Sequence, residues 1–158
     1  MTKGRLLVVF YSRQERQKKV AEAITAKLDC DIEGIIDTKS RRGLIGFLRS
    51  GLEATLKRLT TIEEIKNDPA SYDVVIIGTP VWNGTMSSAI RTYLSQYKED
   101  LQNIAFFCTQ GSSGDNAFKE MGSLCGKKPL ALLRLTSKEV EKGEDTGKIE
   151  QFIRGINH

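Results

Sequence analysis

Three polar loops of this sequence contain groups that would recognise a small molecule with an anionic end and a flat end. The first, Ser12 to Gln17, directly precedes a helical pattern, and a helix N-terminus presents unpaired backbone N–H groups and a positive dipole end to a phosphate. The second contains Trp82, the only tryptophan, whose flat apolar ring suits a flat ligand. The third, Thr109 to Gly114, has small residues whose backbone can approach a ring edge closely. Together these residues favour a phosphorylated heteroaromatic ligand.

Each loop follows a short apolar run that is typical of a buried strand. The clearest run, Val74 to Ile77, is rich in β-branched residues and shows no polar alternation, so both of its faces are expected to be covered. Gly78-Thr79-Pro80 is expected to end this strand, because proline breaks a strand ladder. Asn83-Gly84 is expected to form a turn with positive φ, and Ser87-Ser88 to cap a helix that begins near Ala89.

The same patterns predict four further strands and the helices between them. The strands are Arg5–Tyr11, Ile32–Ile36, Ile104–Cys108 and Leu130–Leu135, and the helices carry apolar stripes at Val20–Leu28, Leu44–Leu59, Ala89–Tyr97, Asn116–Leu124 and Ile149–Ile156. Alternating strands and helices imply right-handed crossovers and one parallel sheet. The sequence therefore predicts an α/β, doubly wound three-layer sandwich with a five-stranded parallel sheet, whose carboxyl edge gathers the three polar loops.

Length and composition predict a single domain over residues 1–158, because no linker or repeat divides the chain. No apolar run approaches the roughly 20 residues that span a bilayer, and Leu6 to Phe10 is too short for a secretory signal. The spacing of Cys30, Cys108 and Cys125 fits free thiols better than disulfides or zinc ligands. The expected location is the cytoplasm, without membrane contact.

The charge distribution argues against several classes of partner and reaction. The formal net charge is +4, and the basic cluster Lys39–Arg42 lacks the interleaved aromatic residues of a nucleic-acid motif, so no nucleic-acid partner is expected. This cluster suits an acidic partner protein, and a solvated surface loop explains it equally well. The only histidine, His158, is the last residue, so no serine, histidine and carboxylate triad is expected. No metal site is expected either.

Three blocks of the sequence resemble the flavodoxin family, and the resemblance covers nearly the whole chain. The blocks are Val8–Arg13, Gly78–Met86 with Arg91–Leu94, and Phe106–Thr109, of which the middle one is the most specific. The resemblance implies a short-chain, flavodoxin-like sheet that binds flavin mononucleotide (FMN), with the phosphate at the first loop and the isoalloxazine ring between the second and third. It also implies that the Asn83-Gly84 peptide lies beside N5 of the flavin, where a peptide flip allows a hydrogen bond to the reduced ring.

The cofactor-binding residues expected on this basis come from all three loops. They are Ser12, Arg13, Gln14, Glu15, Arg16, Gln17, Thr79, Pro80, Val81, Trp82, Asn83, Gly84, Thr109, Gln110, Gly111, Ser112 and Gly114. No residue is expected to be catalytic, because the flavin itself carries out the redox chemistry.

The first loop departs from the family pattern of a hydroxyl residue, any residue, Thr, Gly, any residue and Thr. Gln14, Glu15 and Gln17 replace the two threonines and the glycine, and the Glu15 carboxylate would repel a phosphate. Arg13 and Arg16 offer charge-assisted contacts in compensation. Phosphate binding in an altered form is therefore expected, and weakened or lost flavin binding is the alternative.

The function expected from the resemblance is electron transfer by an FMN protein that works with redox partner proteins. One alternative is a flavin-dependent reductase that passes hydride from NAD(P)H to a quinone or nitro compound. Another is a binding or regulatory module that keeps the fold and has lost the flavin. Colour after incubation with FMN, and NADPH oxidation with a quinone, would separate these three.

Overall fold

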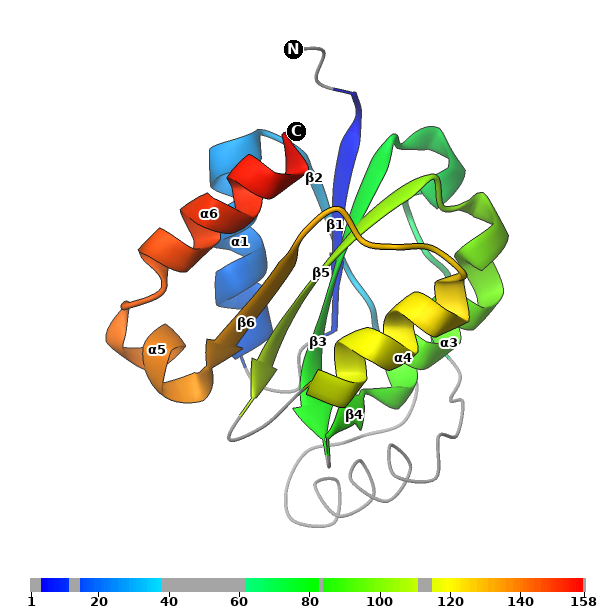
Figure 1. Ribbon diagram of the computed structural model, residues 1–158. Coiled ribbons are helices and arrows are strands. Elements are labelled where there is room, and N and C mark those ends of the chain that lie inside the picture. The colour runs from blue at the N-terminus through cyan, green and yellow to red at the C-terminus, as the bar shows by residue number, and fades with distance from the viewer. Residues whose placement is uncertain (1–3, 12–14, 38–61, 83, 111–114, 158) are drawn as a thin grey trace.

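The computed structural model describes residues 4–11, 15–37, 62–82, 84–110 and 115–157, which form a central sheet between two layers of helices (Figure 1). Five parallel strands lie in the order β2, β1, β3, β5 and β6, and the short β4 pairs antiparallel with the end of β3. Their bounds are β1 Leu6–Phe10, β2 Asp31–Gly34, β3 Val74–Trp82, β4 Thr85–Met86, β5 Asn103–Gln110 and β6 Leu132–Thr136. The predicted doubly wound parallel sheet is confirmed.

Helices cover both faces of the sheet. The α-helices α1 (Arg16–Leu28), α5 (Ser137–Lys142) and α6 (Thr146–Ile156) lie on one face, and α3 (Ser88–Tyr97) and α4 (Asp115–Cys125) lie on the other (Figure 1). Two short 3-10 helices, η1 (Pro69–Ser71) and η2 (Lys98–Asp100), complete the described elements. The helix predicted at Leu44–Leu59 and the basic cluster Lys39–Arg42 lie outside the described residues. Within the described ranges, every helix is too short or too polar to cross a bilayer.

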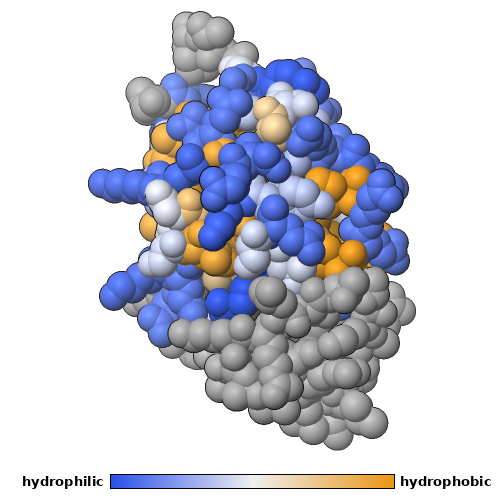
Figure 2. Space-filling view, turned by 90° about the vertical axis from the view of Figure 1, so that its right-hand side faces the viewer, coloured by the Kyte–Doolittle hydropathy of each residue, from blue (hydrophilic) through white to orange (hydrophobic). Residues whose placement is uncertain are grey.

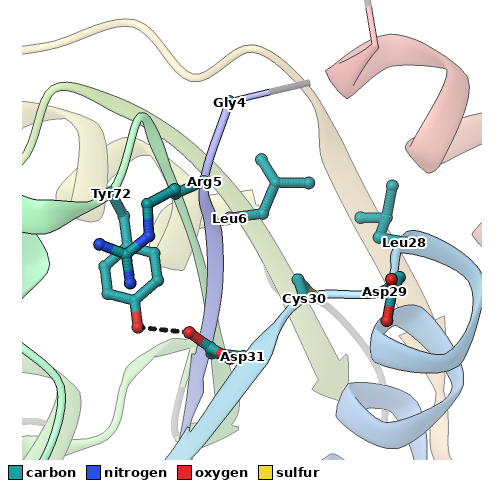
Figure 3. A pocket seen from close by; sticks show the side chains of 8 residues that line it. All are labelled: Gly4, Arg5, Leu6, Leu28, Asp29, Cys30, Asp31 and Tyr72. Atoms are coloured by element: carbon teal, nitrogen blue, oxygen red, sulfur yellow. Dashed lines mark hydrogen bonds between the residues drawn. The ribbon is translucent and has the colours of Figure 1, made fainter. Parts of the chain in front are cut away.

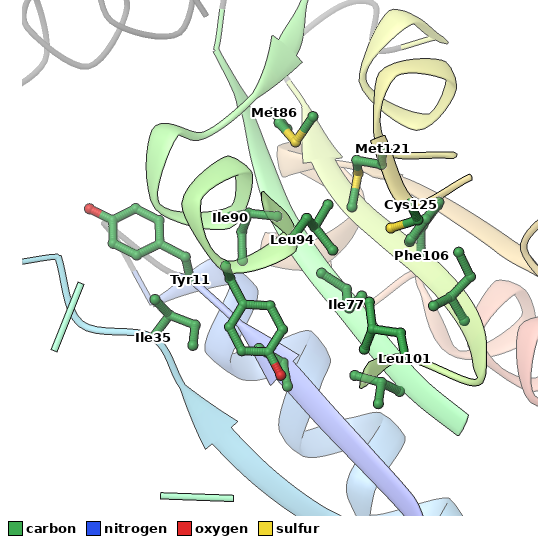
Figure 4. Packing of buried hydrophobic residues seen from close by; sticks show 14 of the residues in the cluster. Tyr11, Ile35, Ile77, Met86, Ile90, Leu94, Leu101, Phe106, Met121 and Cys125 are labelled. Carbon is green, nitrogen blue, oxygen red and sulfur yellow. The ribbon is translucent and has the colours of Figure 1, made fainter. Parts of the chain in front are cut away.

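The central strand β3 supplies side chains to two separate apolar cores. Val75 and Ile77 join the cluster under α3 and α4 (Figure 4), whereas Ile76 joins the cluster under α1 and α6. All three side chains are fully buried. This burial on both faces explains the unbroken apolar run in the sequence. On the side of α3 and α4, the outer surface of the molecule is mainly hydrophilic where Figure 2 is coloured, with separate apolar patches.

The prediction that β3 ends at Gly78 is wrong. The strand continues to Trp82, and Pro80 pairs in register with Thr109 of β5. Gly78 O accepts a hydrogen bond from Tyr11 N on the β1 side, so Pro80, two residues later, also faces that side. Because β1 ends at Phe10, no ladder bond is needed there. The missing N–H of Pro80 therefore costs nothing at this position.

Beyond β3, the positive φ expected at Gly84 and the helix cap expected at Ser87 are confirmed, and Asn83 lies outside the described residues. Gly84 has a φ of 79°, which glycine adopts without steric cost. Ser87 is the N-cap of α3, and its hydroxyl accepts a hydrogen bond from Ile90 N at 3.3 Å. The sequence reading missed α5, which is only six residues long. Its capping box, formed by Thr136 and Glu139, is nevertheless visible in the sequence as a threonine followed three residues later by a glutamate.

Alkaline pH is expected to destabilise the fold through two buried groups that lose a proton at high pH, the Cys125 thiol and the Tyr93 hydroxyl. Burial raises the pKa of Cys125 from the ordinary thiol value of 9.0 to about 11, and burial likewise raises the pKa of Tyr93. Both groups stay protonated in the folded chain at pH values where the unfolded chain has begun to lose these protons. Folded protein then binds more protons than unfolded protein, so stability is complete below pH 9 and falls as pH rises above it.

Urea unfolding of the wild type and of Tyr93→Phe across this pH range measures the effect. The Tyr93 hydroxyl is buried and lacks a hydrogen-bond partner among the described residues. Tyr93→Phe is therefore expected to lose less stability at alkaline pH, and to be at least as stable as the wild type near neutral pH. An identical pH dependence in the two proteins would contradict the assignment to Tyr93.

Candidate functional site

The carboxyl ends of three neighbouring strands lie together at one edge of the sheet (Figure 1). The strands are β1, β3 and β5, which end at Phe10, Trp82 and Gln110. The three polar loops singled out in the sequence follow these ends, and the topology confirms that the strand ends from which they start lie together. Of the predicted site residues, Ser12, Arg13, Gln14, Asn83, Gly111, Ser112 and Gly114 lie outside the described residues, and only the backbone of Trp82 is described.

Gln17 joins the first loop to the end of β5. Its side chain is 1% exposed, and Nε2 donates a 2.9 Å hydrogen bond to Oγ1 of Thr109, which is itself buried. Within the described residues, Oε1 of Gln17 has no partner. A buried amide atom without a partner costs free energy unless something satisfies it. The base of the site thus holds a buried amide atom, an acceptor or, if the amide is flipped, a donor, whose hydrogen-bonding capacity is unused among the described residues.

The first turn of α1 is not capped by its own N-cap side chain. Glu15 occupies the N-cap position in a helical conformation, and its side chain makes no capping hydrogen bond. Its carboxylate is exposed and lies 4.0 Å from Lys18 Nζ. The Glu15 side chain therefore does not satisfy the first-turn N–H groups, and its charge lies beside a lysine on the same helix.

Arg16, the first residue of α1, reaches across to α5. Its Nη2 forms a 2.9 Å ion pair with Oε1 of Glu141, and both side chains are partly exposed. A hydrogen bond from Lys148, together with the Thr136 backbone N–H, lowers the pKa of the nearby Glu139, which keeps this capping carboxylate charged at neutral pH. A capped α5 thus holds Glu141 beside the first loop, so any anion there shares Arg16 with Glu141.

At the second loop, Thr79 is turned inward. It is fully buried, its Oγ1 accepts a hydrogen bond from Ser87 N at 3.0 Å, and it lies 3.1 Å from Ser87 Oγ. Thr79 therefore fastens the end of β3 to the start of α3. Pro80 and Val81, which follow it, are half-buried at the site edge.

The base of the third loop is fastened to α5. The Ser137 hydroxyl donates to Gln110 O at 3.5 Å. Cys108 is fully buried in the core under α3 and α4, with Sγ 3.8 Å from Gln110 Oε1. Its thiol contributes to packing and to this contact.

Sequence reasoning missed three polar residues behind the second loop: Thr85, Arg91 and Glu120. Arg91 Nη2 donates to Thr85 Oγ1 at 2.9 Å and lies 3.5 Å from Glu120 Oε2. Thr85 and Arg91 stood in the blocks singled out beforehand, Gly78–Met86 and Arg91–Leu94, but neither was given a role. Its partner Glu120 belongs to a different helix, and no local pattern reveals such a pairing.

A pocket of about 380 Å³ lies at the opposite edge of the sheet, at the amino ends of β1 and β2 (Figure 3). There the Tyr72 hydroxyl donates to Asp31 Oδ2 at 2.6 Å, and the Arg5 guanidinium lies 4.7 Å from the centre of the Tyr72 ring. These polar side chains satisfy one another. Ligands of doubly wound sheets bind at the carboxyl edge, so this pocket is not the candidate site.

The sequence model of the family described as flavodoxin matches residues 5–142. The chain belongs to the flavodoxin family. The matched residues span β1 to α5 and thus all three loops of the flavodoxin site. No curated protein sequence matches this chain.

Several solved structures share the flavodoxin fold of this chain. A flavoprotein from Lactobacillus acidophilus in complex with FMN is 22% identical, with a TM-score of 0.70 over 89% of this chain and 98% of that one. A provisionally assigned flavoprotein from Bacteroides uniformis is 22% identical, with a TM-score of 0.75 over 97% and 99%. Two-electron reduced Megasphaera elsdenii flavodoxin is 14% identical, with a TM-score of 0.56 over 82% and 85%. At these identities the likeness concerns the fold.

Proposed function

We propose that this flavodoxin-family protein binds FMN at the carboxyl edge of its sheet and exchanges electrons with partner proteins. The observation that carries the proposal is the buried amide of Gln17 in the first turn of α1, whose Oε1 has no partner among the described residues and whose helix lacks a capping bond from its N-cap side chain. The two features together suit a phosphorylated ligand with hydroxyl groups next to its phosphate. The structural neighbour from Lactobacillus acidophilus, which holds FMN, supports this choice of ligand.

The residues present fit FMN despite the altered first loop. Backbone N–H groups of the first turn of α1 would hold the phosphate, because they do not depend on the missing threonine side chains. Arg16 would add a charge-assisted contact, and Gln17 would accept from, or donate to, the sugar chain. Trp82 and Gly84 would flank the ring on one side, and Thr109 and Gln110 would flank it on the other. FMN supplies reversible one- and two-electron redox chemistry when bound.

The proposed role is that of an electron carrier in the cytoplasm. All three cysteines, Cys30, Cys108 and Cys125, are free thiols, which fits a reducing compartment. The net charge of +4 favours an acidic partner protein. We further propose that residues 1–158 form one domain, because every described strand belongs to the same sheet.

Titration of the apoprotein with FMN and with riboflavin tests the proposal. FMN is expected to bind at least roughly tenfold more tightly than riboflavin, because only FMN brings the phosphate that the start of α1 attracts. Quenching of flavin fluorescence measures both affinities. If neither FMN nor riboflavin bound, the proposal would be overturned. Steady NADPH oxidation with a quinone, without an added reductase, would show that the protein is a reductase and not an electron carrier.

A further inference from the structure

Thr85, Arg91 and Glu120 form a buried polar cluster that has no part in the binding roles above. Thr85 is 5% exposed, Arg91 is 9% exposed, and the Glu120 side chain is 17% exposed. Arg91 Nη2 contacts both partners, as described above, and the Thr85 hydroxyl is hydrogen-bonded to Glu120 Oε1. The three residues lie on β4, α3 and α4, so the cluster ties a two-residue strand to both helices of that face.

Helix packing alone does not account for a charged pair in this place. Removing an arginine and a glutamate from water carries a desolvation cost, and apolar side chains of similar size often hold two helices together at least as well. Arg91 Nε is buried and lacks a partner among the described residues, which adds to that cost. The charges do, however, fix the Thr85 hydroxyl from two directions. That geometric restraint is what an apolar contact would not supply.

The strand that the cluster restrains carries the turn of the second loop. Trp82 pairs with Thr85, and Val81 pairs with Met86, so β3 and β4 form a hairpin whose connection contains Gly84, with its φ of 79°. The position of Thr85 therefore sets the position of Gly84 and of the Trp82 backbone. In the sequence resemblance, this is the turn that lies beside N5 of the flavin.

We propose that Thr85, Arg91 and Glu120 act as a clamp that positions Gly84 and the Trp82 backbone against the cofactor. The inference rests on the proposed FMN function and deepens it. The three are positioning residues, since they act through the backbone of β4 and do not touch the flavin themselves. The clamp holds Gly84 and the Trp82 backbone in place before any ligand binds, because its contacts lie entirely within the protein.

Thr85→Val tests the clamp, because valine keeps the shape of threonine and replaces its hydroxyl with a methyl group. In the apoprotein, backbone amides at residues 84–86 are expected to exchange with solvent roughly tenfold faster or more, since hydrogen bonds to charged groups are lost. In the FMN-loaded protein, affinity is expected to fall about tenfold, and the ratio of affinities for oxidised and reduced FMN is expected to change. That ratio sets the midpoint potential of the bound flavin. A general loss of protein stability would leave the midpoint potential unchanged. Thr85→Ser restores the hydroxyl and is expected to restore all three values.

Thr25→Val is the matched control. Thr25 donates a 2.8 Å hydrogen bond to Ala21 O within α1, remote from β4, so its loss is expected to leave exchange at residues 84–86 and the midpoint potential unchanged. Equal exchange of the β4 amides in the wild type and Thr85→Val would overturn the clamp, as would a rise spread evenly over the whole sheet. Failure of the wild type to bind FMN would overturn the proposed function alone. In that case, faster exchange confined to residues 84–86 would still support the restraint of the turn.

Discussion

Replacing Gly78 with alanine is expected to lower the free energy of unfolding by about 3 kcal/mol. A Cβ atom at this position would lie 2.1 Å from Cζ of Phe107. The Phe107 ring cannot swing aside, because it is fully buried in the core under α1 and α6. The Gly78 backbone cannot retreat either, since β3 is paired with β1 and with β5 at this residue. Alanine would therefore force strained rotamers or a shifted strand.

Urea denaturation of Gly78→Ala and of the control Gly147→Ala measures this effect. Gly147 lies in α6, has open space where a Cβ would stand, and does not have a positive φ. Alanine there is expected to leave stability unchanged or to raise it by up to about 1 kcal/mol. Phe107→Leu, combined with Gly78→Ala, is expected to cost less than the sum of the two single changes, because the smaller side chain makes room. Equal stabilities of Gly78→Ala and Gly147→Ala would contradict the overpacking argument.

Local sequence patterns were sufficient wherever a local cause determines the structure. The run Val74 to Ile77 predicted a strand buried on both faces, and the two core clusters meet on that strand. Ser87 and Gly84 were predicted from the chemistry of a helix cap and of a turn, and both behave as predicted. The convergence of the three loops needed only the order of strands and helices, because parallel strands bring their carboxyl ends to one edge.

Features that depend on partners far along the chain were beyond the sequence. The length of β3 depends on where β1 ends, so Pro80 misled the prediction. The bond between Gln17 and Thr109 joins residues that are 92 positions apart. Gln17 was correctly placed in the first loop as a candidate, but nothing local shows that its side chain turns inward. The site was therefore predictable as a set of loops, and the contacts that position them were not.

Replacing Arg16 with alanine is expected to weaken FMN binding by roughly tenfold to a hundredfold, because a charge-assisted hydrogen bond to the phosphate is lost. Riboflavin, which lacks the phosphate, is expected to bind this variant as it binds the wild type. The prediction rests on the position of Arg16, which is the first residue of α1 and lies where the loop after β1 enters that helix. Fluorescence titration with both flavins at two salt concentrations measures the change, and salt should weaken FMN binding more in the wild type than in Arg16→Ala.

Glu141→Gln is expected to have the opposite effect on FMN affinity, through the same arginine. In the apoprotein, Arg16 is already engaged by Glu141 at 2.9 Å, so binding of a phosphate must compete with that carboxylate. A neutral glutamine competes less, and FMN binding is expected to tighten by a few-fold, in keeping with the modest strength of a partly exposed ion pair. The matched control is Glu150→Gln, which breaks the partly exposed Lys27–Glu150 pair at the other end of α1 and makes the same change in net charge. If Glu150→Gln tightened FMN binding as much as Glu141→Gln, the effect would come from the overall charge, and Arg16 would not be the residue for which phosphate and carboxylate compete.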